Sequence, residues 1–214
     1  MSDDGSTLAS LNMNNDAVRL WSATDGRELR SVTFEENEHL GAQNGIALSP
    51  DGKLLAALTE SSKASMKGLE TKRQLHIFEV ASGRKTQSLN FKTTKVQLGT
   101  FNRTSYQTTS LAFVSAAGSP DLWLAVRDDE SMKIFDVASG RELKSITALQ
   151  VTKQTDPSLE MFASKFLFNR NRQLLSVITD GNKINVVDVA SGNTVHTLAG
   201  HGPHAGAIIG VSFS

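Results

Sequence analysis

The sequence VASGRELKSI at residues 137–146 decides the fold, because three variants of it recur along the chain. The variants are TDGRELRSV at 24–32, VASGRKTQSL at 80–89 and VASGNTVHTL at 189–198. One glycine marks each copy, at Gly26, Gly83, Gly140 and Gly192, and a large apolar residue stands five positions earlier, at Trp21, Phe78, Phe135 and Val187. Copies follow one another at roughly 50 to 60 residues, which indicates repetition of one supersecondary unit.

Each repeat alternates apolar and polar residues with the period of two that a pleated strand imposes. The third repeat has four such runs: SLAFV (110–114), LWLAVRD (122–128), SMKIFDV (131–137) and ELKSITAL (142–149). Turn residues separate the runs. Ser49-Pro-Asp-Gly52 predicts a hairpin turn, and the glycine of each copy predicts a backbone position with positive φ. No segment predicts a helix, so we expect an all-β chain of four-stranded antiparallel units.

Four strands per repeat are typical of a propeller blade, and the third strands here share an ending. They read VRLWS (18–22), HIFEV (76–80), KIFDV (133–137) and NVVDV (185–189), and Gly200-His201 follows the last fourth strand. With the SPDG turn at 49–52, these features make nearly the whole chain resemble the WD-repeat family. The resemblance implies a β-propeller whose blades each hold a buried hydrogen-bond network of a His, a Ser or Thr, an Asp and a Trp.

The repeats depart from that family pattern in the residues of the network. Only Trp21 is a Trp, and no copy reads Trp-Asp. In the third repeat Asp129 stands where the Asp of the network belongs, but Phe135 replaces the Trp and cannot donate a hydrogen bond. We therefore expect packing to contribute more to stability than the polar network does.

We expect one WD-repeat-like propeller region over residues 1–214, holding about four blades' worth of strands. Its units lie at approximately 1–34, 45–91, 109–149 and 164–200, with a lone first strand at 206–214. The first unit lacks a first strand, because Ser2-Asp-Asp-Gly5 matches the turn Ser49-Pro-Asp-Gly52. We favour an arc of a larger ring, which would be open to self-association. Two alternatives are that 206–214 closes a ring of four blades, and that two arcs join into a ring of eight.

Composition excludes several classes of protein. The 214 residues include 22 basic and 22 acidic side chains and no cysteine. Balanced charge argues against binding to nucleic acid or an anionic membrane, and the lack of cysteine removes disulfides, thiolate metal sites and cysteine nucleophiles. No apolar run is long enough to cross a bilayer and no signal peptide precedes the repeats, so we expect a soluble cytoplasmic protein.

The sequence predicts no catalytic, cofactor-binding or metal-binding residues, and no enzyme. Histidines occupy unrelated repeat positions: His39, His76, His196, His201 and His204. We expect His76 and His196 to lie at the surface or to be partly packed. The acidic residues Asp128, Asp129 and Glu130 predict the cap of a tight hairpin, with a Ca²⁺ site as the alternative.

Four insertions lengthen the repeats, at 35–44, 61–73, 92–108 and 150–163, and we expect them on one face of the propeller. The third insertion mixes charge with aromatics, as binding hot spots do, and its candidate partner-binding residues are Lys92, Lys95, Phe101, Arg103 and Tyr106. These features favour a non-catalytic scaffold that binds a protein partner through its loops. The resemblance implies a place within a larger regulatory or signalling protein. The alternative is an enzymatic or ligand-binding propeller, lactonase-like or dehydrogenase-like, with a site in its central channel.

Overall fold

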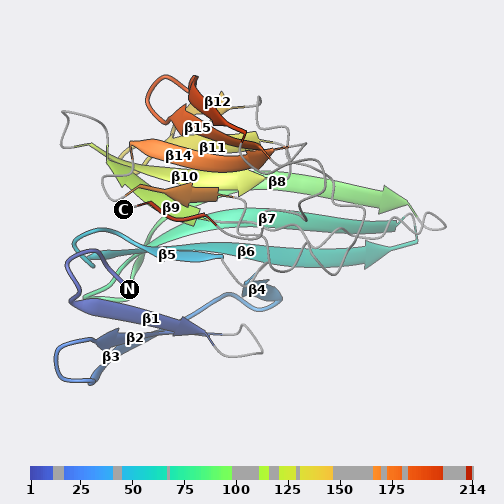
Figure 1. Cartoon of the computed structure of the whole chain (residues 1–214). Helices are drawn as coiled ribbons and strands as arrows, with labels where there is room; N and C mark the ends of the chain where they lie inside the picture. The colour runs from blue at the N-terminus through green and yellow to red at the C-terminus, as the bar shows by residue number, and fades with distance from the viewer. Residues whose placement is uncertain are drawn as a thin grey trace. The chain divides into compact units, whose positions relative to one another are not determined.

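A computed structural model of the chain shows an all-β protein (Figure 1). It describes residues 1–11, 17–40, 45–66, 68–97, 111–115, 121–128, 131–146, 166–169, 173–179, 183–199 and 211–213. Within these residues there is no helix, and the strands form four antiparallel sheets. The chain divides into two compact units, Met1–Phe113 and Val114–Ser214.

The first unit contains a three-stranded and a five-stranded sheet. The three-stranded sheet consists of β1 (Thr7–Leu11), β2 (Ala17–Ser22) and β3 (Glu28–Thr33), in that order. The five-stranded sheet consists of β4 (Glu38–Leu40), β5 (Ile46–Leu48), β6 (Leu54–Ser65), β7 (Gly68–Glu79) and β8 (Lys85–Gln97). Both short strands, β4 and β5, pair with β6, and β7 and β8 follow β6 in order.

Two four-stranded sheets contain the remaining strands, and the boundary between the units falls within the first of these, β9. The first sheet consists of β9 (Leu111–Ser115), β10 (Leu122–Asp128), β11 (Ser131–Asp136) and β12 (Glu142–Ile146). The second consists of β13 (Phe166–Phe168), β14 (Leu174–Thr179), β15 (Lys183–Asp188) and β16 (Thr194–Leu198). The four strands predicted for the third repeat are confirmed.

The repeat glycines share one backbone conformation, as the sequence predicts. Their φ values are 72° at Gly26, 70° at Gly83, 71° at Gly140 and 79° at Gly192. Each glycine N–H donates to the carbonyl four residues earlier, at 2.7–2.9 Å. A side chain other than glycine is strained in this left-handed region, so the glycine fixes the corner between the last two strands of each sheet.

Each corner is preceded by a register shift at the same repeat position. The shift lies immediately before Trp21, Phe78, Phe135 and Val187. An extra residue in one strand of an antiparallel pair bends the strand and increases its twist. The four sheets therefore share not only a turn but also a bent hairpin, as expected of copies of one module.

Hydrogen bonds between a carboxylate and a serine of the same turn stabilise the corners. Asp136 Oδ1 accepts hydrogen bonds from the Ser139 N–H at 2.7 Å and from Ser139 Oγ at 2.5 Å. These bonds lower the pKa of Asp136 below its ordinary value. In the first corner the two residue types are exchanged, and Ser22 bonds to Asp25. The hydrogen bond is thus kept while the order of its partners is reversed.

Each unit buries the facing sides of its two sheets. In the first unit, the three-stranded sheet contributes Val18, Leu20 and Val32, and the five-stranded sheet contributes Leu40, Leu48, Leu55, Ala57, Phe78 and Val80. In the second unit, the core comprises Val114, Ala125, Met132, Ile134, Ile146, Leu175, Val177, Val187 and Val189. Burial of these side chains is the main stabilising contribution to sheet-on-sheet packing of this kind.

Three of the expected insertions differ from loops where the structure describes them. Residues 61–65 and 68–73 continue β6 and β7, and residues 92–97 continue β8. Within 35–44, residues Glu38–Leu40 form β4. The loop predictions are wrong there because these segments lack the regular apolar alternation that was the signal used to identify strands. Residues 98–108 and 150–163 lie outside the described part of the chain.

Candidate interaction surface

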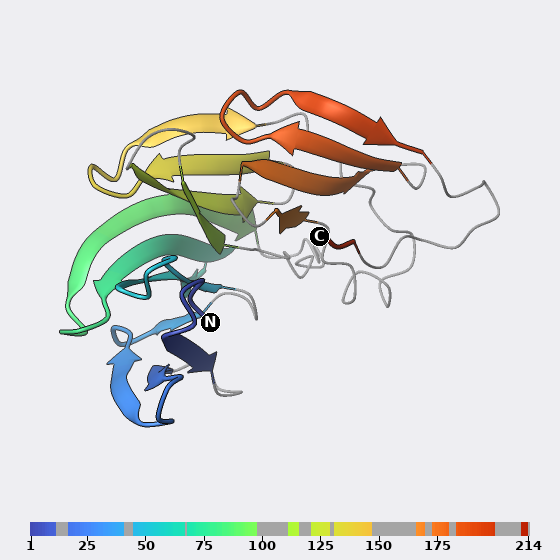
Figure 2. The same ribbon diagram turned by 60° about the vertical axis from the view of Figure 1, so that its left-hand side comes forward.

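A three-stranded arm extends the five-stranded sheet beyond the end of β4. β6, β7 and β8 contain 12, 12 and 13 residues, whereas β2, β11 and β15 contain 6 each. The strands curve together as one ribbon (Figure 2). Their pairing continues from Leu54↔Glu79 to Ser65↔Gly68, and β8 accompanies β7 as far as Gln97. Continuous hydrogen bonding along three strands makes the arm a defined surface rather than a loose loop.

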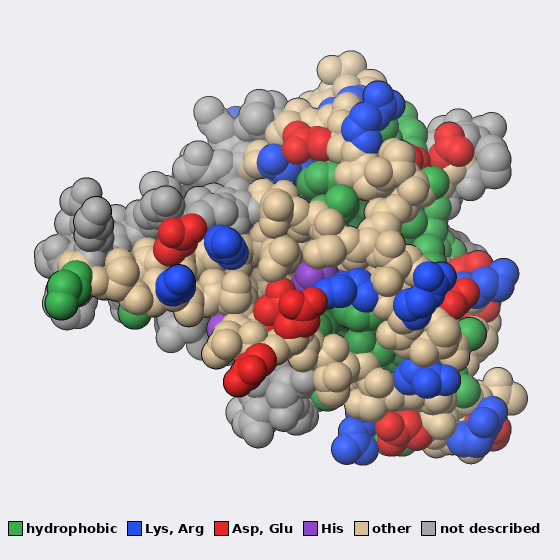
Figure 3. Space-filling view, turned by 180° about the vertical axis from the view of Figure 1, so that it is seen from behind, with side chains coloured by type: hydrophobic (Ala, Val, Ile, Leu, Met, Phe, Trp, Pro, Cys, Tyr) green, Lys and Arg blue, Asp and Glu red, His purple; other side chains and the backbone are tan. Residues whose placement is uncertain are grey.

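The end of the arm exposes apolar side chains. Met66 is 99% exposed at the turn and Leu69 is 40% exposed beside it, and Figure 3 shows hydrophobic atoms at the end of the projection. Lys63 and Lys72 are exposed nearer the base. A solvent-exposed methionine on a rigid support is a common feature of protein-binding surfaces, because its flexible thioether adapts to different partners.

At its base, the arm is braced by side chains across the strands. Arg73 Nε lies 2.5 Å from Glu60 Oε1, and both side chains are largely buried. Farther out, the hydroxyls of Ser62 and Thr71 are 3.0 Å apart. These cross-strand pairs stabilise the pairing of β6 with β7.

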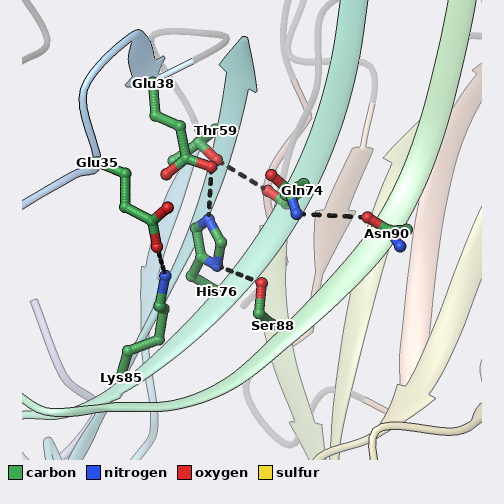
Figure 4. Close-up of polar contacts among 8 residues, drawn as sticks. All are labelled: Glu35, Glu38, Thr59, Gln74, His76, Lys85, Ser88 and Asn90. Atoms are coloured by element: carbon green, nitrogen blue, oxygen red, sulfur yellow. Dashed lines mark hydrogen bonds and ion pairs between the residues drawn. The ribbon is translucent and has the colours of Figure 1, made fainter.

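The segment that connects the two sheets of the first unit forms a tight turn beside the base of the arm. The Glu38 N–H donates to the Glu35 carbonyl at 2.9 Å, and Asn37 adopts a φ of 72°, which asparagine tolerates better than most residues. The turn brings two carboxylates onto the sheet: Glu35 pairs with Lys85, and Glu38 contacts His76 (Figure 4). The Lys85 ammonium lowers the pKa of Glu35 by hydrogen bonding and by charge.

His76 lies at the centre of this polar cluster and is only 1% exposed. Its Nδ1 is 2.9 Å from Ser88 Oγ, and its Nε2 is 3.4 Å from Glu38 Oε1. The ring also meets Phe78 edge to face at 6.1 Å. The imidazole thus links β7, β8 and the first residue of β4 at the edge of the hydrophobic core.

Burial lowers the pKa of His76, although the carboxylate of Glu38 opposes the shift. The ring is therefore neutral at pH 7. Because the Glu38 oxygen is a hydrogen-bond acceptor, this assigns the proton to Nε2, which donates to Glu38, and leaves Nδ1 to accept the Ser88 hydroxyl proton.

Ser88, His76 and Glu38 follow the order of hydroxyl, imidazole and carboxylate found in a hydrolase triad. The backbone around Ser88 therefore decides whether this serine could act as a nucleophile. Such a nucleophile needs backbone donors that stabilise an oxyanion, usually at a sharp turn or a helix end. Ser88 instead lies within β8, where it pairs with His76 in the regular ladder. The arrangement suits a structural clamp, in which a neutral histidine holds the inter-sheet connection against the sheet.

Sequence reasoning missed His76, for which surface or partial packing was expected; the residue is buried. A signal was present in the repeats. The third-strand residue two positions before Trp21, Phe78, Phe135 and Val187 is polar in every copy, and it pairs with a hydroxyl residue in the fourth strand. The pairs are Arg19↔Ser31, His76↔Ser88, Lys133↔Ser145 and Asn185↔Thr197. His196, in contrast, is exposed as expected.

The other predicted site residues are distributed as follows. The backbones of Lys92 and Lys95 lie in β8, where they pair with Arg73 and Glu70. Phe101, Arg103 and Tyr106 lie outside the described residues, as do Asp129, Glu130, His201 and His204. The Asp128↔Ser131 pairing confirms a tight hairpin at the acidic cluster. In the described part of the chain, no group of three acidic or histidine side chains is placed to hold a metal ion, and no helix could span a membrane.

Comparison with known proteins supports the fold through structure and not through sequence. No protein-family model and no curated protein matches the sequence. A chain in the crystal structure of the mitotic checkpoint complex is 13% identical, with a TM-score of 0.55, over 94% of this chain and 48% of that one. The β-propeller domain of Myceliophteria thermophila Cps50 (Swd1) is 12% identical, with a TM-score of 0.55, over 92% of this chain and 53% of that one. The chain therefore has a β-propeller fold, and it spans about half the length of these two structures.

Proposed function

We propose that the chain is part of a WD-repeat-like propeller that serves as a non-catalytic platform for protein–protein interaction. The arm formed by β6, β7 and β8 carries this proposal, because it is a braced ribbon with exposed Met66 and Leu69 at its end. Preorganisation lowers the conformational entropy lost on binding, so a rigid arm binds better than a loop of the same composition. We further propose a cytoplasmic location and a place within a larger regulatory or signalling protein.

One hydrogen bond supports the WD-repeat assignment beyond the propeller fold. The Trp21 indole N–H donates to Ser10 Oγ at 2.8 Å, which joins the third-strand tryptophan to a hydroxyl on the neighbouring strand. The resemblance implies such a Trp and Ser pair as half of the network in each blade. The first repeat thus keeps a part of the network that the resemblance implies.

The test combines capture with direct binding. The wild-type chain and the double variant Met66→Asp/Leu69→Asp are used to capture proteins from a native extract, and a protein bound only by the wild type is then purified. We expect its affinity for the variant to be at least about tenfold weaker, since a charge would have to be buried at the contact. The control is Leu143→Asp, which charges another exposed leucine in the second unit. Equal binding by all three chains would remove the arm from the interaction surface.

A further inference from the structure

The contact between consecutive sheets follows one rule in both units. The fourth-strand residue four positions after the corner glycine donates to the carbonyl of an alanine in the next corner. Arg30 Nη2 donates to Ala81 O at 3.0 Å in the first unit, and Lys144 Nζ donates to Ala190 O in the second. Two positions farther along, an apolar side chain is buried in the core between the sheets: Val32 is 3% exposed and Ile146 is 4% exposed.

The last sheet presents the same positions without a sheet against them. His196 and Leu198 of β16 stand four and six residues after Gly192. Leu198 is 52% exposed, in contrast to the burial of Val32 and Ile146, and all five residues of β16 are exposed. The last sheet therefore has, on its outer strand β16, the residues that would donate and pack in a sheet-to-sheet contact. These residues are exposed.

The first sheet presents the complementary side of the contact. Its Leu8 pairs with Trp21, as Leu55 pairs with Phe78 in the five-stranded sheet. Leu55 is fully buried by the preceding sheet, whereas Leu8 is 42% exposed.

The corner glycines show the same difference. A Cβ on Gly83 would meet Arg30 of the preceding sheet, and a Cβ on Gly192 would meet Ile146. A Cβ on Gly26 would have no atom of the described residues within 4 Å. The corner at residues 23–26 therefore has space for the last strand of another sheet.

We propose that two copies of this chain associate head to tail, with β16 of one copy packed on the first sheet of the other. His196 then donates to the carbonyl of Thr24, which stands two residues before Gly26 as Ala81 and Ala190 stand before Gly83 and Gly192, and Leu198 packs in the core behind Leu8 and Trp21. The contact repeats, between copies, the interface that already joins consecutive sheets within each unit. It is heterologous, so each copy uses one surface as donor and a different one as acceptor. Because the chain spans about half of the propeller structures it matches, two copies hold the strands of one full propeller.

Sedimentation velocity of the 214-residue chain measures this association. We expect a species of twice the 23.1 kDa chain mass at concentrations up to about 100 µM. Leu198→Lys and Leu8→Lys should each weaken the association at least about tenfold, because each places a lysine in the contact. The control Leu143→Lys, at another exposed leucine of the second unit, should leave the association unchanged.

Mixing the two variants tests the head-to-tail geometry. Leu8→Lys keeps an intact β16, and Leu198→Lys keeps an intact first sheet, so the mixture should regain a dimer that neither variant forms alone. A monomeric wild type at the highest concentration would overturn the proposal. So would association that Leu8→Lys leaves intact, since a contact of β16 with β16 would not involve Leu8. Circular dichroism of each variant establishes that the sheets are retained.

Discussion

Replacing His76 with leucine tests whether the buried imidazole holds the inter-sheet turn in place. Leucine fills much of the space of the ring but provides no donor for Glu38, whose side chain is almost fully buried. A buried polar group left without a partner costs about 1–3 kcal/mol, and more when it is charged. Ser88 is exposed, so its hydroxyl can bond to water instead and adds little to the cost. We expect His76→Leu to lower the free energy of unfolding by about 2–3 kcal/mol.

A double-mutant cycle with Glu38→Ala isolates the contact itself, because alanine has no acceptor for the His76 N–H. At pH 8 the imidazole is neutral, so the contact is a hydrogen bond to a carboxylate, for which about 1.5–3 kcal/mol is typical. The distance of 3.4 Å exceeds the usual range for such bonds. We therefore expect a coupling free energy near the lower limit, about 1–1.5 kcal/mol. Urea unfolding at pH 8 measures all four chains, and Glu35→Ala in the same turn is the matched control, with little change expected because that carboxylate is mostly exposed.

The same histidine gives a pH dependence whose sign is fixed by its lowered pKa. The unfolded chain takes up a proton near pH 6.5, whereas folded His76 takes it up only at a lower pH. Between these two values the unfolded state binds more protons, so stability falls as the pH is lowered from about 7, by at most about 1.4 kcal/mol per pH unit. His76→Leu should remove this slope. A His76→Leu chain as stable as the wild type at pH 8, with the same slope, would refute the clamp.

The corner residues provide the remaining predictions. Gly26→Ala should cost about 1–2 kcal/mol from its positive φ alone, and Gly83→Ala should cost more because the added Cβ would lie 2.5 Å from Arg30 Cδ; thermal unfolding of the two variants compares them. Asp136→Asn removes the charge that accepts both hydrogen bonds from Ser139. Because the pKa of Asp136 is lowered in the folded state, its contribution is present above about pH 4 and is lost below it. The wild type should thus lose more stability than the asparagine variant as the pH falls through that range, which urea unfolding at successive pH values measures.

The sequence was sufficient for those parts of the fold that short-range chemistry determines. A glycine that must adopt positive φ, followed by a strand, marks each corner, and Gly26, Gly83, Gly140 and Gly192 are all found there. Strand boundaries in the third repeat follow from alternation, because one side of each strand faces a core.

The candidate surface was less predictable because it depends on residues distant in sequence. The arm is polar on both faces, so its strands resemble a loop in composition. His76 is buried by a turn that contains Glu38, which lies 38 residues away in the chain. Alternation places His76 on the same face as Phe78, but only the position of the turn decides whether that face is covered.

The repeated polar pair in the third and fourth strands explains why the histidine clamp occurs at His76 and Ser88. In each sheet the third-strand member of the pair stands two positions before the large apolar residue of the repeat, of which Phe78, Phe135 and Val187 are buried. Arg19 at this position is exposed and pairs with Glu28 across the sheet. His76, in contrast, lies beneath the connection between the sheets and is shielded from solvent. At an exposed position a long charged side chain can reach solvent. A buried position instead requires a neutral group whose two polar atoms both form hydrogen bonds. Histidine satisfies both conditions when its pKa is lowered by burial, so the connection that covers this position and the residue beneath it form one structural unit.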